Sequence, residues 1–240
     1  MPDRSSETER LLAELPEIEL LGVLRGASNY TFLARLDPHP PGGLHAVYKP
    51  ARGESPLWDF PTGTLYKREV AAYQLSKALG WPNIPPTVVR RKGPHGVGAC
   101  QLFIDADRRH FLGEQSIRPD TWVRVALFDV ITNNADRKSG HCLFDSEDRV
   151  WVIDHGLTFH EDQKLRTVIW DFAGQPLPPD LCGDVERALI DLEKGRLEAI
   201  ERLISPAEVD VLKRRMRGVM APRWRFPDPS SAWSIPWPPV

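Results

Sequence analysis

The segment from Asn133 to Phe159 constrains the fold of this chain more than any other. It places Asp136 in a loop after an apolar helical stretch and Asp154 at the end of a strand, with a predicted β-hairpin between them. Such a hairpin lets the two carboxylates converge on one cleft, where they repel each other unless a cation lies between them. Oxygen ligands of this kind suit Mg²⁺ or Mn²⁺. The segment therefore predicts an acidic metal-binding cleft.

The first hundred residues predict an antiparallel sheet covered by one helix. An N-terminal helix is expected from Ser6, whose spacing to Glu9 is that of a capping box, to the break at Pro16. The further expected elements are strands at 20–24, 30–36 and 45–49, a helix within 62–80 that ends at Gly80, and strands at 87–92 and 98–104. The order β-β-β-α-β-β indicates an α+β fold with the helix packed on the sheet.

The second half of the chain predicts mostly helices around the hairpin. The expected elements are a helix capped by Asp120 and ended at Asn133, hairpin strands at 141–145 and 149–154, and two amphipathic helices between Asp180 and Met220, the second starting after Ser205. This half therefore adds a helical layer beside the predicted metal site.

Composition and charge argue against several classes of protein. Lys+Arg 31 against Asp+Glu 33 gives a net charge of −2, so no nucleic-acid partner is expected. No apolar run approaches the roughly 20 residues of a transmembrane helix, and the N-terminus lacks an apolar signal segment. Three scattered cysteines form no disulfide framework. We therefore expect a cytoplasmic protein.

Histidine and cysteine side chains near the hairpin invite a reading as a zinc site. The four candidates are His141, Cys142, His155 and His160. Consecutive strand residues point to opposite faces, so His141 and Cys142 could not easily share one ion, and no pair has zinc-finger spacing. Cys142 is therefore predicted to be a small core residue.

Two motifs in the constraining segment resemble the catalytic core of the protein-kinase-like superfamily. Residues 136–141 (DRKSGH) are similar to the D-R-x-x-x-N loop of the phosphatidylinositol 3-/4-kinases and their small bacterial relatives, and 154–156 (DHG) to their D-x-G metal motif. A more distant likeness is to the HipA-type kinases. The resemblance implies a two-lobed fold, with 1–104 as N-lobe, 105–225 as a reduced, mostly helical C-lobe and 226–240 as a Pro/Trp-rich tail.

The same resemblance implies roles for individual residues around ATP and Mg²⁺ or Mn²⁺. Asp136 would orient or deprotonate the acceptor hydroxyl, and Lys138 would contact the transferred phosphate. Asp154 and His141 would hold the metal. The other implied nucleotide-site residues are Lys49 on the α/β-phosphates with its ion-pair partner Glu69, the phosphate-covering loop Gly26, Ser28 and Asn29, and the hinge residues Gln101, Phe103 and Ile104.

The implied activity is ATP-dependent phosphoryl transfer to an alcohol-type acceptor, which could be a protein, a lipid or a small molecule. Transfer of AMP on the same fold remains open, because it needs the same lysine and metal aspartate. A pseudokinase that binds ATP as a regulatory protein also remains open. It is favoured by His141 in place of the loop's asparagine and by a phosphate loop with only Gly22 and Gly26.

Two C-terminal features have both a plain and a functional interpretation. The basic run Lys213–Arg215, continued by Arg217, Arg223 and Arg225, could be a solvated helix face or a surface for an acidic partner. Trp233 and Trp237, set among prolines, could pack on the domain or serve as a ligand for another protein. The sequence leaves both alternatives open.

Overall fold

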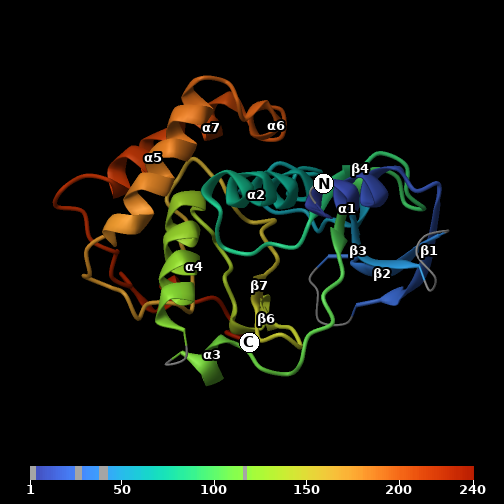
Figure 1. Cartoon of the computed structure of the whole chain (residues 1–240), viewed down its shortest axis with the longest axis horizontal. Helices are drawn as coiled ribbons and strands as arrows, with labels where there is room; N and C mark the ends of the chain where they lie inside the picture. The colour runs from blue at the N-terminus through green and yellow to red at the C-terminus, as the bar shows by residue number, and fades with distance from the viewer. Residues whose placement is uncertain (1–3, 25–28, 38–42, 116–117) are drawn as a thin grey trace.

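A five-stranded antiparallel sheet makes up most of the first lobe (Figure 1). The structure is a computed structural model that describes residues 4–24, 29–37, 43–115 and 118–240. The strands lie in the order β1-β2-β3-β5-β4. They are β1 (Glu17–Val23), β2 (Phe32–Asp37), β3 (Leu44–Pro50), β4 (Thr87–Arg90) and β5 (Gly98–Leu102). With helix α2 (Leu65–Leu79) between β3 and β4, the predicted β-β-β-α-β-β order is confirmed.

Helix α2 lies between the sheet and the helices of the second lobe (Figure 1). Most of its residues are buried, including the charged Arg68 and Glu69. It ends at Gly80, whose φ of 86° is the left-handed conformation that glycine adopts without strain, as predicted.

Helix α1 (Arg4–Glu14) packs against β4 and β5. The guanidinium of Arg90 in β4 donates hydrogen bonds to the carbonyl oxygens of Leu12 and Leu15, at 2.9 and 2.5 Å. Because the helix already includes Arg4, Ser6 lies inside it, and the predicted cap at Ser6 was wrong.

The second lobe packs helices around the β6–β7 hairpin. Its elements are α3 (Phe111–Glu114), α4 (Pro119–Thr132), β6 (Cys142–Phe144), β7 (Val150–Val152), α5 (Pro179–Glu193), α6 (Glu198–Glu201) and α7 (Pro206–Val219), with 3₁₀ turns at Ala51–Gly53, Ser139–His141 and Ala232–Ser234. The hairpin and the α7 start at Ser205 are as predicted, whereas α3 and α6 were not foreseen. Asp120 does not cap α4, because Pro119 takes the first helical position and Arg118 the cap.

The largest hydrophobic core joins the two lobes. It takes side chains from α2, α4, the hairpin, α5 and α7, including Leu75, Leu127, Val152, Val185 and Leu212. Because α2 contributes to this core, the first lobe is not an independent layer resting on the second. No helix in the part of the chain that the structure describes is long and apolar enough to cross a membrane.

The tail folds back onto the second lobe. Phe226 is buried, the Ser139 amide donates to the carbonyl of Pro239 at 2.8 Å, and the Thr167 amide donates to the carbonyl of Ser234 at 3.0 Å. The tail thus packs through the Phe226 side chain and through backbone hydrogen bonds, while the side chains of Trp233 and Trp237 remain 81% and 85% exposed. Its use as a ligand for another protein stays a prediction.

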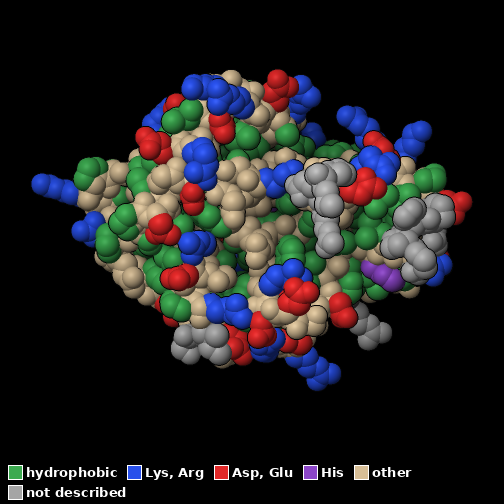
Figure 2. Space-filling view, viewed as in Figure 1, with side chains coloured by type: hydrophobic (Ala, Val, Ile, Leu, Met, Phe, Trp, Pro, Cys, Tyr) green, Lys and Arg blue, Asp and Glu red, His purple; other side chains and the backbone are tan. Residues whose placement is uncertain are grey.

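The basic run on α7 is partly engaged within the protein. Arg217 forms an ion pair with Glu193, Lys213 lies 3.9 Å from Glu201, and Arg215 donates to the carbonyl of His160 at 2.6 Å. Figure 2 shows basic and acidic side chains interspersed over the visible face. These contacts favour the interpretation of the basic run as an ordinary solvated face of α7 over its interpretation as a binding surface for an acidic partner.

Burial of two of the three thiols leads to a chemical prediction. Cys100 and Cys142 are fully buried, and burial raises the pKa of each thiol to about 12. Cys182 on α5 is partly exposed. Because the thiolate is the reacting species, we expect Ellman's reagent to titrate one thiol in the folded protein and three after denaturation. Rapid reaction of a second thiol without denaturant would contradict this packing.

Candidate active site

The buried side chain of Arg137 joins the two motif segments. Its guanidinium is fully buried and contacts both carboxylate oxygens of Asp129 on α4, with N–O distances from 3.0 to 3.2 Å. Nη1 donates to the carbonyl of Ile153 at 2.8 Å, and Nη2 donates to Nε2 of His155 at 2.7 Å. Since Arg137 follows Asp136 and His155 follows Asp154, this network holds the two acidic segments next to each other.

Lys49 on β3 meets both predicted acidic partners. Its Nζ lies 2.5 Å from Oε1 of Glu69 and 3.1 Å from Oδ1 of Asp154. The second oxygen of Glu69 accepts a hydrogen bond from the His155 amide at 3.0 Å. The structure therefore brings together residues that lie 105 positions apart in the chain.

All three of these side chains have shifted pKa values. The Lys49 ammonium holds the pKa of Asp154 far below its usual range, although burial opposes this. Burial lowers the pKa of Lys49, but the carboxylates of Asp154 and Glu69 outweigh it and raise that pKa above its usual value. Burial raises the pKa of Glu69, and Lys49 opposes the change. Lys49 and Asp154 are therefore charged at neutral pH, and the Asp154 side chain is 48% exposed.

A left-handed backbone conformation turns the chain at Asp154 itself. Its φ is 62°, a region that residues other than glycine seldom occupy. A glycine two residues on, Gly156, could be expected to make this turn, but it does not. Gly156 has no positive φ, and a Cβ there would lie 3.5 Å from Cβ of Leu65, an ordinary contact. The strain therefore falls on the residue that carries the exposed carboxylate.

Asp136 lies in the loop after α4. Its amide donates to Oδ1 of Asn134 at 3.0 Å, and its Oδ2 lies 3.6 Å from Nζ of Lys138. Burial raises the pKa of Asp136, the positive charges of Lys138 and Arg166 oppose this, and the negative charge of Asp154 adds to it. The Asp136 and Asp154 carboxylates are therefore close enough for the negative charge of one to raise the pKa of the other.

His141 lies beside Asp154, with its Nε2 3.3 Å from Oδ2. Burial lowers the pKa of His141 to about 4, although the Asp154 carboxylate opposes this, so the imidazole is neutral at pH 7. Its Nδ1 accepts a hydrogen bond from the Lys138 amide at 3.3 Å, which assigns the ring proton to Nε2. A metal could bind Nε2 only after that proton moved, so Asp154 is the better-prepared ligand of the two.

The phosphate-covering loop is only partly visible. Gly26 and Ser28 lie outside the described residues. The side-chain oxygen of Asn29 accepts a hydrogen bond from the Ser55 amide at 2.7 Å, which holds the residue against the β3–α2 connection. The implied role of Asn29 at the phosphates stays a prediction.

Fewer of the predicted hinge residues are available to contact a nucleotide than the sequence suggests. The Gln101 side chain is buried and donates to Oγ1 of Thr87 at 2.8 Å, so its predicted nucleotide contact is wrong for the side chain. The Phe103 amide donates to the carbonyl of His45 at 3.0 Å and is not available to a base. Ile104, half-buried after β5, is the one of the three whose role as a hinge contact stays a prediction.

Sequence reasoning missed Asp129, Arg68 and the structural role of Arg137. Asp129 interrupts the apolar run ALFDVIT, and a carboxylate on a buried helix face requires a cationic partner. That signal could have led to the partner, because the loop that directly follows α4 contains only two basic residues, Arg137 and Lys138.

Within the described residues no group of three or more His, Cys, Asp or Glu side chains could hold a metal, and the zinc interpretation gains no support.

Two solved structures share this arrangement of lobes. The kinase CtkA of Helicobacter pylori matches with a TM-score of 0.52 at 14% identity, over 85% of this chain and 92% of that one. The Fam20 protein of hydra, solved with sugar, matches with a TM-score of 0.53 at 14% identity, over 92% and 89%. At this identity the likeness concerns the fold alone. The chain has a two-lobed, protein-kinase-like fold.

The family is defined by a closer relative. No family model matches the sequence. Protein Rv2133c of Mycobacterium tuberculosis (strain ATCC 25618 / H37Rv) is 37% identical to the chain, and the alignment covers 92% of each protein. The chain belongs to the same family as Rv2133c.

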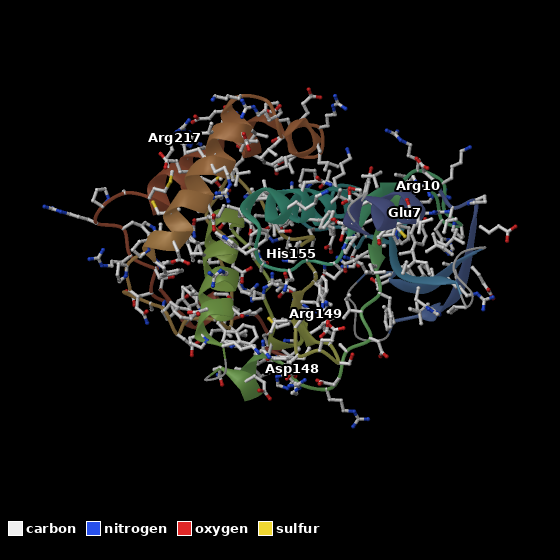
Figure 3. The ribbon with its side chains drawn as sticks, in the orientation of Figure 1. Glu7, Arg10, Asp148, Arg149, His155 and Arg217 are labelled. Carbon is white, nitrogen blue, oxygen red and sulfur yellow. The ribbon has the colours of Figure 1, made fainter. Side chains whose placement is uncertain are left out.

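Removal of the Arg137 side chain tests whether its network is essential to the fold. Arg137→Ala leaves the Asp129 carboxylate buried without a cation, and breaking a buried pair in this way costs about 3–5 kcal/mol. Arg217→Ala is the matched control, because Arg217 extends from α7 at the surface (Figure 3) and its side chain is 55% exposed. That change should cost about 1 kcal/mol or less. Urea unfolding measures both, and equal losses would refute the assignment.

Proposed function

We propose that the protein is an ATP-dependent phosphotransferase. The observation that carries the proposal is the contact of Lys49 with both Glu69 and Asp154 inside a kinase-like fold. The Lys49 ammonium is not enclosed in the hydrophobic core, because it contacts the half-exposed carboxylate of Asp154. It is suited to bind phosphate oxygens as a fixed positive charge.

The donor groups fit a divalent cation that is bound partly by phosphates. Mg²⁺ is usually held by one or two carboxylates together with substrate phosphates, and not by an all-protein cage. Asp154 offers an ionised, half-exposed carboxylate, and His141 lies next to it. When bound, the metal would neutralise charge on the phosphates. Preference between Mg²⁺ and Mn²⁺ depends on whether the His141 imidazole joins the ligands.

Asp136 and Lys138 would act on the acceptor side. The acceptor hydroxyl would lose its proton to the Asp136 carboxylate, its oxygen would form the new bond to the γ-phosphorus, and the bond to the β-phosphate oxygen would break to release ADP. Burial raises the pKa of Asp136, which makes it a better proton acceptor. Lys138 would steady the transferred group. Ile104 would be the remaining hinge contact for adenine.

The finer features of the proposal rest on the sequence motifs. The likeness to phosphatidylinositol 3-/4-kinases and HipA-type kinases concerns the loop that holds Asp136 and the motif that holds Asp154. The acceptor class (protein, lipid or small molecule), a cytoplasmic location and a protein partner for the tail stay predictions. AMP transfer and a pseudokinase role remain outcomes of the experiments below.

Loss of the Asp154 carboxylate should abolish metal-dependent turnover. Asp154→Asn removes the ionised ligand at nearly constant volume, so we expect ATP turnover with Mg²⁺ or Mn²⁺ to fall on the order of 100-fold or more. Asp162→Asn, at a side chain that is 82% exposed, is the matched control and should retain full activity. Turnover by Asp154→Asn equal to that of the unmodified protein would remove the proposed function.

The label that is transferred identifies the reaction. The purified protein is incubated with Mn²⁺ and ATP labelled on either the γ- or the α-phosphorus, and label retained on protein or added acceptors is measured. We expect the γ-label to transfer, with a mass increment of one phosphoryl group on any self-modified residue. Transfer of the α-label would establish AMP transfer instead. Nucleotide binding without transfer of either label would favour the pseudokinase.

A further inference from the structure

Two consecutive residues of α2 hold the segment that follows Asp154. Oε2 of Glu69 accepts a hydrogen bond from the His155 amide at 3.0 Å, and Nη1 of Arg68 donates to the carbonyl of Thr158 at 2.6 Å. Oγ1 of Thr158 closes the turn by donating to the carbonyl of His155 at 2.7 Å. The turn 155–158, directly after Asp154, is therefore held at both ends by two adjacent residues of α2.

Arg68 is in turn fixed to the second lobe. Its Nη2 lies 2.5 Å from Oε1 of Glu208 on α7, and its guanidinium lies over the Phe60 ring, 5.0 Å from the centroid. Arg68 is 2% exposed and Glu208 7%. The other oxygen of Glu208 accepts from the Ser205 amide at 2.8 Å as part of the α7 capping box, so this carboxylate is immobilised by the helix start.

The guanidinium shape matters for this contact. Its planar fork lets one nitrogen donate to the Thr158 carbonyl while another pairs with Glu208, which a lysine ammonium cannot reproduce in the same plane. A buried ion pair also contributes little net stability compared with apolar residues of similar volume. The pair is therefore better explained by the position it imposes than by the stability it adds.

The position of Arg68 on α2 links the Arg68–Glu208 pair to the Lys49–Glu69 pair. Arg68 and Glu69 are adjacent on α2, so a rotation or shift of the helix that withdrew Glu69 from Lys49 would also pull Arg68 out of its buried contacts. Just beyond the C-terminal end of α2 lies Trp81, whose indole N–H donates to Asp184 on α5 at 2.9 Å. That second link is distant in the chain from the Asp154 turn and serves as a comparison.

From these contacts we infer that Arg68 and Glu208 are positioning residues of the nucleotide–metal site. They lock α2 to the second lobe and fix the turn 155–158, so that the Lys49–Glu69 pair and the Asp154 carboxylate are held ready before nucleotide arrives. This inference rests on the proposed function, because it concerns the same site. It predicts that the metal-dependent part of nucleotide affinity depends on Arg68, although Arg68 touches neither ligand.

The experiment compares nucleotide affinity with and without metal. The full-length protein is titrated with a fluorescent ATP analogue in Mg²⁺ or in EDTA. The readout is the dissociation constant in EDTA divided by the dissociation constant in Mg²⁺, which measures how much the metal strengthens binding. The thermal midpoint is measured in parallel. The variants are Arg68→Lys, Glu208→Gln and the double variant Arg68→Met with Glu208→Leu. The control is Asp184→Ala, which breaks the link between Trp81 and α5 together with a surface ion pair to Arg187 within α5.

We expect Arg68→Lys and the double variant to lower the ratio roughly 10-fold or more, the range seen when a residue that orients a metal ligand is lost. The double variant should regain thermal stability relative to Glu208→Gln, because apolar side chains replace a broken buried pair. Stability regained without recovery of the ratio separates positioning from simple support of the fold. Asp184→Ala should keep the ratio of the unmodified protein.

Three results would overturn the inference. The first is an unchanged ratio in Arg68→Lys and the double variant, and the second is recovery of the ratio together with stability in the double variant. The third is an equal fall in Asp184→Ala, which would make the effect a general response to loosening of α2. If the unmodified protein shows no metal-dependent nucleotide binding, the proposed function fails first, and that is seen before any variant is made.

Discussion

The buried guanidinium of Arg137 is the contact on which the rest of the site depends. It is fully buried, and its charge is balanced by Asp129, which is itself fully buried on α4. Neither charge could remain in the core without the other. Because the same guanidinium also reaches Ile153 and His155, the requirement to satisfy one buried cation places the loop after α4 against the end of the hairpin.

Helix α2 completes the site from the other lobe. Glu69 gives one oxygen to Lys49 and the other to the His155 amide, so a single carboxylate joins β3, α2 and the segment after Asp154. Figure 3 shows His155 in the interior, between α2 above and the hairpin below. Lys49 lies between the carboxyl groups of Glu69 and Asp154, and the ionised, half-exposed carboxylate of Asp154 can also bind a further cation.

The sequence predicted which charged residues lie together better than it predicted the polar contacts around them, and the roles of these residues stay predictions. Lys49, Glu69, Asp136 and Asp154 could be placed together from their succession along the chain, and the structure brings them close. The prediction failed at Gln101, because that buried side chain is used for a local hydrogen bond to Thr87 that depends on the packing of neighbouring strands. A polar residue's sequence neighbours do not reveal which partner satisfies it in the folded chain.

The sequence by itself determined the β-β-β-α-β-β order of the first lobe, the hairpin, the end of α2 at Gly80 and the start of α7 after Ser205, because backbone preferences and hydrophobic periodicity act over a few residues. Only the tertiary structure decided that Asp154 adopts the left-handed turn, that Arg68 reaches Glu208 across 140 positions, and that the tail lies against Ser139. These features arise from the need to pair buried charges and backbone groups between distant segments, and that need is set by what folding brings together.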